Sequence, residues 1–259
     1  MLNKSKKERL VIVIPARYRS ERLPGKPLAE ISGKPMVQHV YERALQVPQV
    51  QAVLVATEDI RVVDAVRAFG GRCLMTSSLH LSGTDRLVEV MNEVKAEVYI
   101  NLQCDEPLAR PGDISKLAIN MRDDTSVQVG TLCHLIPSEE AGNPNTVKVV
   151  LAANRNALYF SRACIPYTRA GVARYFKHVG IYAYRREALQ EFADLPRPMI
   201  EQVEMLEQLR LLNAGIPIRV FEVEPTGPGV DTLECLERVR ALFANEASLF
   251  TELAKGTIT

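Results

Sequence analysis

Four cations stand in a short loop directly after the first apolar run of the chain. Residues 10–14 are uniformly apolar, and Arg17, Arg19, Arg22 and Lys26 follow within the next twelve positions. Guanidinium groups and an ammonium group match the oxygens of a triphosphate or of a pyrophosphate leaving group. Three prolines and a glycine limit the freedom of this loop. Together these features favour phosphate binding over a solvated basic loop.

Carboxylates follow two later segments. The apolar stretch 97–103 runs into Asp105 and Glu106, and Asp231 stands in the glycine-containing segment 227–232. Carboxylate oxygens combined with nucleotide phosphates are the usual surroundings of Mg²⁺. From the residues alone, a turn at Asp105 and a helix cap at Asp231 or Thr232 remain open.

A third polar segment, Ser82, Gly83 and Thr84, precedes a helical pattern. Backbone N–H groups at a helix start are unpaired, so these residues could cap the helix. Their hydroxyl and amide groups could equally bind the polar edge of a nucleobase.

Common nucleotide and metal motifs are absent. The chain has neither G-x-x-x-x-G-K-[ST] nor G-x-G-x-x-G, so a P-loop and a dinucleotide-binding Rossmann site are disfavoured. Five cysteines without C-x-x-C spacing and four histidines without H-E-x-x-H give no disulfide framework, zinc finger or metal helix.

The elements that would carry these residues alternate along the first half. Strands are predicted at 10–16, 52–57, 72–75 and 97–103, and helices at 36–47, 60–69 and 84–94. This order predicts an α/β fold with a mostly parallel central sheet and helices on both faces. The carboxyl ends of parallel strands share one edge of the sheet, which is where ligands bind.

The second half follows a different pattern. Strands predicted at 127–136, 146–151 and 177–184 either extend the sheet in a mixed manner or form a separate β-rich part. One helix is predicted over 199–212, an extended segment over 216–223 and a C-terminal helix over 232–254.

Composition excludes several classes of protein. Of the 259 residues 47% are hydrophobic and 24% charged, and the net charge is +1. These values are typical of a globular domain and disfavour general nucleic-acid binding. No apolar run approaches the roughly 20 residues of a membrane span, and none suits a signal peptide. We therefore expect a cytoplasmic protein without membrane insertion.

Six segments in order resemble one known family: PARYRSERLPGKPL, HLSGTDR, LQCDEP, HVGIYAYR, MLEQLR and GVDT. They are similar to the 3-deoxy-manno-octulosonate (Kdo) cytidylyltransferases, most closely to the capsule-associated form. The resemblance extends from about residue 10 to residue 243. It implies the reaction CTP + Kdo → CMP-Kdo + pyrophosphate, with Mg²⁺ as cofactor, for lipopolysaccharide or capsule biosynthesis.

The resemblance also implies the architecture. The fold would be of the nucleotide-diphospho-sugar transferase type, usually a homodimer. Residues 10–125 would form the nucleotide-binding core, 126–222 a smaller mixed lobe for dimerisation and sugar binding, and 223–259 a return to the core with a C-terminal helix.

Roles are carried over residue by residue. The resemblance implies that the CTP phosphates are held by Ala16, Arg17, Ser20, Arg22 and Lys26, and the cytidine by Ser82, Gly83, Thr84, Arg86 and Gln103. Asp105 and Asp231 would bind Mg²⁺. The region expected to hold the sugar acid contains Arg162, His178, Tyr182, Glu201, Glu204 and Gln208.

The residue pattern agrees with the sugar assignment. On one continuous helix, Glu201, Glu204 and Gln208 would share a face, with Val203, Met205, Leu206, Leu209 and Leu212 on the core side. The sugar carboxylate would need a cation, either Arg162 or a protonated His178. A solvated acidic face and a core histidine are the alternatives.

Two positions depart from the family pattern. Cys104 stands where the family usually has glycine, so a Cβ and a thiol lie next to the nucleotide and Asp105. Leu233 replaces a common proline in the first turn of a helix, where we expect little effect.

Rival functions remain. A sialic-acid (N-acylneuraminate) cytidylyltransferase has the same chemistry and a similar basic loop. An inactive nucleotide-sensing module would explain Cys104, and a glycosyltransferase would not need the triphosphate-binding loop. No dedicated general base stands out, so metal activation of the attacking hydroxyl is preferred over a histidine mechanism.

Overall fold

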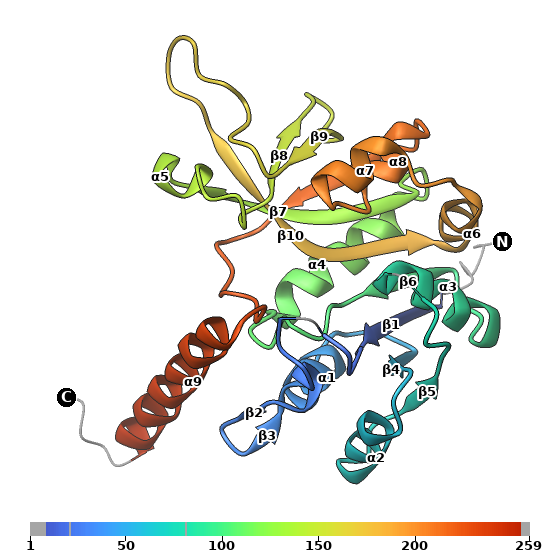
Figure 1. The fold of residues 1–259 in the computed structure, drawn as a ribbon, viewed down its shortest axis with the longest axis vertical. Helices are drawn as coiled ribbons and strands as arrows, with labels where there is room; N and C mark the ends of the chain where they lie inside the picture. The colour runs from blue at the N-terminus through green and yellow to red at the C-terminus, as the bar shows by residue number, and fades with distance from the viewer. Residues whose placement is uncertain (1–8, 21, 81, 255–259) are drawn as a thin grey trace, which may run out of the picture.

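The computed structural model describes residues 9–20, 22–80 and 82–254. Within these residues the chain forms a nine-stranded sheet, in which seven strands follow the order β11-β7-β10-β6-β1-β4-β5, β8 pairs with β10, and β9 pairs with β8 (Figure 1). Its strands are β1 (Leu10–Pro15), β4 (Ala52–Thr57), β5 (Cys73–Met75), β6 (Val98–Asn101), β7 (Val129–Ile136), β8 (Lys148–Leu151), β9 (Ala157–Ser161), β10 (Tyr175–Arg185) and β11 (Ile218–Glu222). A separate small hairpin is formed by β2 (Glu30–Ile31) and β3 (Lys34–Pro35).

The first half of the chain builds the parallel part of the sheet. Strand β1 pairs in parallel with β4 and β6, and β4 pairs in parallel with β5. Strand β10 then runs antiparallel to β6 and to β7, and β11 is parallel to β7. The strands of the second half therefore extend the same sheet, which confirms the first of the two arrangements left open by the sequence.

Strand β1 is buried on both faces, as its apolar run predicts. Val11 and Val13 belong to one hydrophobic cluster, and Ile12 and Ile14 belong to the other. A strand with side chains in two cores needs a layer of helices on each side.

Helices provide those two layers. Helices α1 (Met36–Leu45), α2 (Ile60–Ala68) and α4 (Pro111–Asp123) pack in the cluster that contains Ile12. Helices α3 (Gly83–Glu93), α6 (Arg186–Asp194) and α8 (Leu209–Asn213) pack in the cluster that contains Val11. The remaining helical elements are η1 (Lys26–Leu28), α5 (Ser138–Ala141), α7 (Met199–Glu204) and α9 (Leu233–Ala254).

The single helix expected over 199–212 is wrong. The chain forms α7 and α8 as two helices, separated at Met205, whose backbone is left-handed with φ 53° and ψ 46°. Val203 and Met205, expected on the core side, are exposed, whereas Leu206 and Leu209 are buried. Helical periodicity predicted the buried Leu206 and Leu209 but not the exposed Val203 of α7, and it could not reveal the break at Met205.

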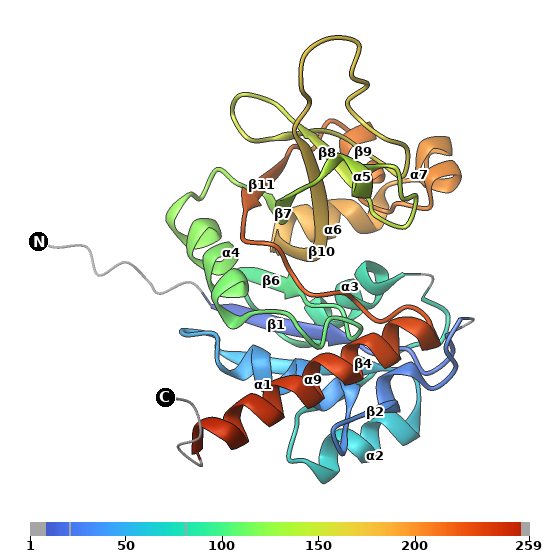
Figure 2. The ribbon, with the colours of Figure 1, turned by 90° about the vertical axis from the view of Figure 1, so that its left-hand side faces the viewer.

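Helix α9 packs against the hairpin and α1 (Figure 2). The rings of His39 and Phe243 lie 4.6 Å apart, and Arg240 Nε donates to the carbonyl of Glu30 at 2.8 Å. The chain segment before α9 thereby returns Asp231 to the edge of the sheet at which β1 ends. In the part of the chain that the structure describes, every helix is too short or too polar to cross a bilayer.

Candidate active site

Tyr18 holds the basic loop in place after β1. Its backbone N–H donates to Glu58 Oε1 at 3.0 Å, and its carbonyl accepts from Gly25 N at 3.0 Å. The Arg61 guanidinium lies over its ring, 3.5 Å from the centroid. These contacts connect the loop to the residue after β4 and to α2.

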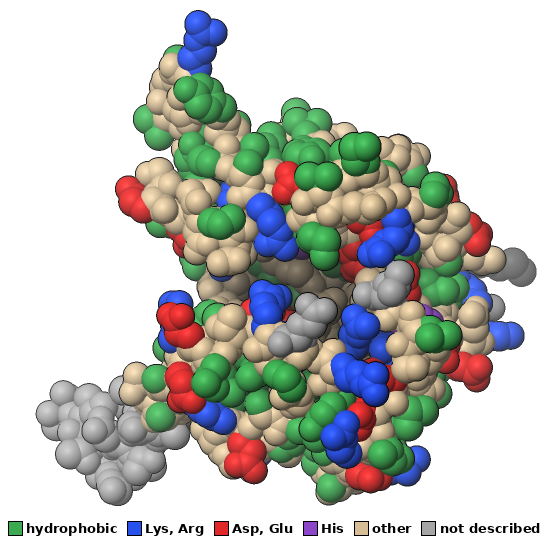
Figure 3. All heavy atoms as spheres, in the orientation of Figure 1, with side chains coloured by type: hydrophobic (Ala, Val, Ile, Leu, Met, Phe, Trp, Pro, Cys, Tyr) green, Lys and Arg blue, Asp and Glu red, His purple; other side chains and the backbone are tan. Residues whose placement is uncertain are grey.

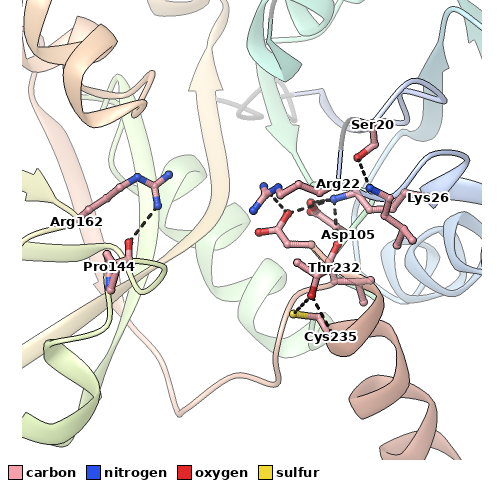
Figure 4. A network of polar contacts seen from close by, with 11 residues as sticks. Ser20, Arg22, Lys26, Asp105, Pro144, Arg162, Thr232 and Cys235 are labelled. Atoms are coloured by element: carbon pink, nitrogen blue, oxygen red, sulfur yellow. Dashed lines mark hydrogen bonds and ion pairs between the residues drawn. The ribbon is translucent and has the colours of Figure 1, made fainter.

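Two distant aspartates converge on one cation of this loop. Lys26 Nζ lies 2.6 Å from Asp105 Oδ2 and 3.4 Å from Asp231 Oδ1, and Arg22 reaches Asp231 Oδ1 at 3.0 Å (Figure 4). Burial alone would lower the pKa of Lys26, but the Asp105 carboxylate outweighs it and raises that pKa above its ordinary value. The sequence prediction that these residues share one edge of the sheet is therefore confirmed by geometry.

The acidic pair after β6 divides between two environments. Asp105 lines the cavity beside Lys26, whereas Glu106 lies against Gly229. Burial, reinforced by the Asp105 charge, raises the pKa of Glu106 to about 8. A Cβ added at Gly229 would lie 3.2 Å from Glu106 Oε1, which explains the glycine next to Val230 and Asp231. Of this pair, only Asp105 lines the cavity.

A cavity of about 460 Å³ lies in front of the converging carboxylates, and we call it the nucleotide cavity. Figure 3 shows a hollow at the centre of this face, with Lys and Arg side chains at its rim. It is lined by Pro15, Arg17, Arg19, Ser20, Arg22, Lys26, Pro27, Gly83, Gln103, Cys104, Asp105 and Met205. All but two of the candidate phosphate and metal residues thus line this cavity. The exceptions are Ala16, which is buried, and Asp231, which contacts Lys26 at the cavity wall.

The residues expected around the cytidine separate into two groups. Ser82 caps α3 by accepting from Asp85 N at 3.1 Å, and Gly83 and Gln103 line both this cavity and the next one. Thr84 and Arg86 are fully buried and line neither cavity. Arg86, which lies in α3, is instead 2.9 Å from Glu58 Oε2. Glu58 also accepts the backbone N–H of Tyr18, so this carboxylate connects α3 to the basic loop.

A second cavity of about 730 Å³ adjoins the first, and we call it the acceptor cavity. Five of the six residues expected to hold the sugar line it: Arg162, His178, Tyr182, Glu201 and Gln208. Gly180 also lines it, beside an irregularity in the pairing of β10 between Val179 and Tyr182. Such a bulge turns side chains that a regular strand would direct elsewhere.

Glu204 has a different position. Its carboxylate accepts from Ser161 Oγ at 2.5 Å and from the backbone N–H of Arg162 at 2.9 Å. The Arg162 side chain donates to the carbonyls of Glu204 at 2.9 Å and of Pro144 at 3.2 Å. Figure 4 shows Arg162 on the opposite side of the site from Arg22, Lys26 and Asp105. The hydrogen bonds with Glu204 therefore fix Arg162, and Arg162 lines the acceptor cavity whereas Glu204 does not.

His178 is neutral in this environment. Burial lowers the pKa of its imidazole to about 3, and its Nε2 lies 3.0 Å from Thr131 Oγ1. Because Thr131 Oγ1 donates to the carbonyl of Ile181 at 2.9 Å, the network assigns the imidazole proton to Nε2. In the structure His178 is therefore an uncharged group of the acceptor cavity at neutral pH, and Arg162 is a cation of that cavity.

A neutral His178 has a measurable consequence for stability. Its folded pKa lies below the unfolded value of about 6.5, so its contribution to the free energy of unfolding is complete above pH 6.5 and falls as the pH drops towards 3. We expect His178→Gln to flatten the pH dependence of stability between pH 6 and pH 4 by up to about 1.4 kcal/mol per pH unit. Urea unfolding of both chains across this range measures it, and equal slopes would contradict the assignment.

Glu207 is a residue of the acceptor cavity that the sequence reasoning missed. Its Oε1 accepts from Thr84 Oγ1 at 2.5 Å, and burial raises the pKa of its carboxyl group. On a continuous helix Glu204 would have faced the cavity, but the left-handed backbone at Met205 changes the direction of the chain and turns Glu207 inwards. The MLEQLR motif contained the signal, although helical spacing selected the wrong glutamate.

Glu201 lines the acceptor cavity and is also part of an ion pair. Arg210 donates to it twice, at 2.8 and 2.7 Å, and Arg197 donates to its Oε1 at 3.0 Å. Burial would raise the pKa of Glu201, but the hydrogen bonds from Arg210 and Arg197 outweigh burial and lower it. The acidic face is therefore neither solvated nor free of partners.

Cys104 fits into the core beneath Asp105. Its side chain is buried in the cluster that contains Ile12, and burial raises the pKa of its thiol. Asp105 nevertheless reaches Lys26, and its carbonyl accepts from Val230 N at 2.8 Å. A cysteine at this position is compatible with the convergence of the two aspartates.

Comparison with known proteins identifies the class. The cationic loop, the paired carboxylates and the adjoining cavity at one edge of an α/β sheet define a nucleotidyltransferase, and a family model described as Cytidylyltransferase matches residues 11–219.

Closer relatives identify the family. A curated protein of Escherichia coli named 3-deoxy-manno-octulosonate cytidylyltransferase is 65% identical over 237 residues, 91% of this chain and 96% of its own length. A protein of the same name from Syntrophus aciditrophicus (strain SB) is 46% identical over 246 residues, 93% of this chain and 99% of its own. The chain belongs to the 3-deoxy-manno-octulosonate cytidylyltransferase family.

A solved structure agrees with this assignment. A CMP:2-keto-3-deoxy-manno-octonic acid synthetase complexed with CTP is 64% identical, with a TM-score of 0.90, covering 92% of this chain and 99% of its own. The fold and the sequence thus give the same family.

Proposed function

We propose that this chain transfers CMP from CTP to Kdo and releases pyrophosphate, for lipopolysaccharide or capsule biosynthesis. The observation that carries the proposal is the convergence of Asp105 and Asp231 on Lys26 beside the nucleotide cavity. The membership of the family supports the two substrates. Residues 10–125 bind the nucleotide, and residues 126–222 hold the sugar and contribute to dimerisation.

The nucleotide residues have distinct tasks. Arg17, Arg22 and Lys26 neutralise the triphosphate and the departing pyrophosphate, because fixed cations stabilise charge that develops on a leaving group. Ser20 and the backbone at Ala16 adjoin the phosphates. Ser82, Gly83 and Gln103 contact the cytidine, and Thr84 and Arg86 support them from beneath.

The two aspartates are suited to Mg²⁺. Lys26 already marks a point at which oxygens of both carboxylates can contact one positive charge. Among the described residues no group of three or more His, Cys, Asp or Glu side chains could hold a metal ion. The remaining ligands would come from phosphate oxygens and water, an arrangement that Mg²⁺ commonly adopts. When bound, Mg²⁺ neutralises phosphate charge and lowers the pKa of a nearby hydroxyl.

The chain aligns the reactants from two sides. The anomeric hydroxyl oxygen of the sugar attacks the α-phosphorus, the bond from that phosphorus to the pyrophosphate oxygen breaks, and the hydroxyl proton passes to solvent. Arg162 binds the sugar carboxylate, while Tyr182, Glu201, Glu207 and Gln208 provide polar groups for its hydroxyls. Neutral His178 contributes a hydrogen bond and not a charge, and Glu204 holds Arg162.

A coupled assay tests this function. We expect pyrophosphate release from CTP and Mg²⁺ in the presence of Kdo, with formation of CMP-Kdo. N-acetylneuraminate in place of Kdo is the control for the sialic-acid alternative. Nucleotide binding without pyrophosphate release would instead indicate an inactive sensor.

Arg22 is expected to act chiefly on CTP. We predict that Arg22→Ala raises KM for CTP about tenfold or more, with a smaller effect on kcat, because a charge-assisted phosphate contact is lost. Steady-state kinetics with varied CTP measure it. Arg122→Ala, which removes an arginine from α4, is the matched control. An unchanged KM for CTP in Arg22→Ala would refute the phosphate contact.

We also propose a cytoplasmic homodimer. Tyr167 and Val172, in the segment between β9 and β10, are almost fully exposed in a single chain. Apolar side chains of this size are commonly covered at an interface. Light scattering coupled to size-exclusion chromatography determines the mass in solution.

A further inference from the structure

Met205 has a backbone conformation that its side chain does not explain. Its φ of 53° lies in the left-handed region, which residues other than glycine adopt at an energetic cost. The residue is 75% exposed, so burial of the side chain does not offset that cost. Strain of this kind in a native structure is often associated with function.

The position of Met205 relates it to both cavities. Gly83, Gln103 and Met205 are the three described residues that line the nucleotide cavity and the acceptor cavity alike. Every other described residue of the nucleotide cavity falls between Pro15 and Asp105. Met205 is therefore the contribution of the second half of the chain to the nucleotide cavity.

The junction of the cavities is where the two substrates must meet. Gly83 stands at the start of α3 and Gln103 shortly after β6, and the Gln103 amide lies 3.4 Å from a Cβ built at Gly83. These two residues form one wall of the junction, and Met205 comes from the chain segment between α7 and α8. Its thioether is apolar and flexible, so it can cover a junction without competing for hydrogen bonds.

Water is a competing nucleophile at such a junction. If a water oxygen attacks the α-phosphorus, the bond to the pyrophosphate oxygen breaks, the water proton passes to solvent, and the products are CMP and pyrophosphate. An apolar side chain that excludes water would suppress this reaction while leaving the sugar hydroxyl in place.

We propose that Met205 determines the acceptor of the reaction: it covers the junction of the nucleotide and acceptor cavities and excludes water, so that CMP passes to the sugar hydroxyl. The inference rests on the proposed transfer from CTP to Kdo and adds a specificity-determining residue to it. The left-handed backbone of Met205 ends α7 at this junction.

The test compares product ratios in the full chain. With CTP, Mg²⁺ and Kdo, CMP and CMP-Kdo are separated by ion-exchange chromatography and quantified. We expect Met205→Gly to raise the ratio of CMP to CMP-Kdo about tenfold. Met205→Leu, which restores an apolar side chain of similar size, should recover most of the wild-type ratio. Met199→Gly removes another exposed methionine, which lines neither cavity, and should keep the wild-type ratio.

Stability separates this role from a purely structural one. Glycine accepts the left-handed conformation without strain, so we expect the Tm of Met205→Gly to equal or exceed that of the wild type. Met205→Asn, which also tolerates this conformation but is polar, should form excess CMP too and serves if the glycine variant does not fold.

The results of these experiments distinguish failure of the inference about Met205 from failure of the proposed function. A wild-type product ratio in Met205→Gly, or in Met205→Asn where that variant serves, overturns the inference about Met205 alone. So does an equal rise in the ratio in Met199→Gly. A wild-type chain that forms no CMP-Kdo overturns the proposed function and the inference together.

Discussion

Replacing Asp105 by asparagine is expected to reduce kcat by about 10³-fold or more while the protein remains folded. The carboxylate is one of the two proposed Mg²⁺ ligands, and loss of an interaction worth several kcal/mol in the transition state has an effect of this size. The amide is isosteric, the side chain is partly exposed, and the backbone bond from Val230 to the Asp105 carbonyl is unaffected.

The measurement is the rate of pyrophosphate release with saturating CTP and Kdo across a range of Mg²⁺ concentrations. Asp123→Asn, at the surface end of α4, is a matched control that removes a carboxylate away from the site. Circular dichroism and the Tm establish that both variants fold. Turnover close to the wild-type rate in Asp105→Asn would refute the metal role of this residue.

The second large effect concerns stability. Arg210→Met is expected to lower the free energy of unfolding by about 3–5 kcal/mol, because it removes the buried member of an ion pair and leaves the Glu201 carboxylate with only the partly exposed Arg197. The side chains of Arg210 and Glu201 are 5% and 3% exposed, and their two hydrogen bonds are short. The guanidinium also lies 4.2 Å from the centre of the Phe192 ring, which the substitution loses as well.

The chain offers a matched control for this prediction. Arg197 contacts the same Glu201 oxygen at 3.0 Å but is 45% exposed, so Arg197→Met should cost no more than about 1 kcal/mol. Urea unfolding at pH 7 measures both variants. Equal losses in the free energy of unfolding for Arg210→Met and Arg197→Met would show that burial does not set the strength of an ion pair with Glu201.

The Glu201 pair also has a defined pH window. Its lowered pKa means that the pair contributes fully above the unfolded glutamate pKa and weakens as the pH falls through the folded value. The cost of Arg210→Met should therefore shrink in acid.

Much of the site was predictable because it depends on topology. Apolar runs end at the basic loop and at Asp105, and parallel pairing of β1 with β6 brings those two ends to one edge. The resemblance of the GVDT segment to the family added Asp231 to the predicted site, although this residue lies far along the chain from Asp105 and Lys26. The convergence of Arg22, Lys26 and both aspartates followed from these two sources.

The side-chain environments were not predictable in the same way. Arg86, expected at the cytidine, pairs with Glu58 in the interior, and Glu204 supports Arg162 from outside the cavity. Burial keeps His178 neutral, and its hydrogen-bond partner Thr131 lies in β7, far from it in sequence. Each outcome depends on contacts between distant segments, and local periodicity carries no information about them.

The sequence by itself determined the strands, the family and the chemistry that meets at the edge of the sheet, because apolar pattern and residue type act locally. Only the tertiary structure decided which carboxylates are paired, which histidine stays uncharged and where the helix after Met199 breaks. Burial and long-range pairing set these properties, since they depend on the dielectric surroundings and partners that exist only once the chain has folded.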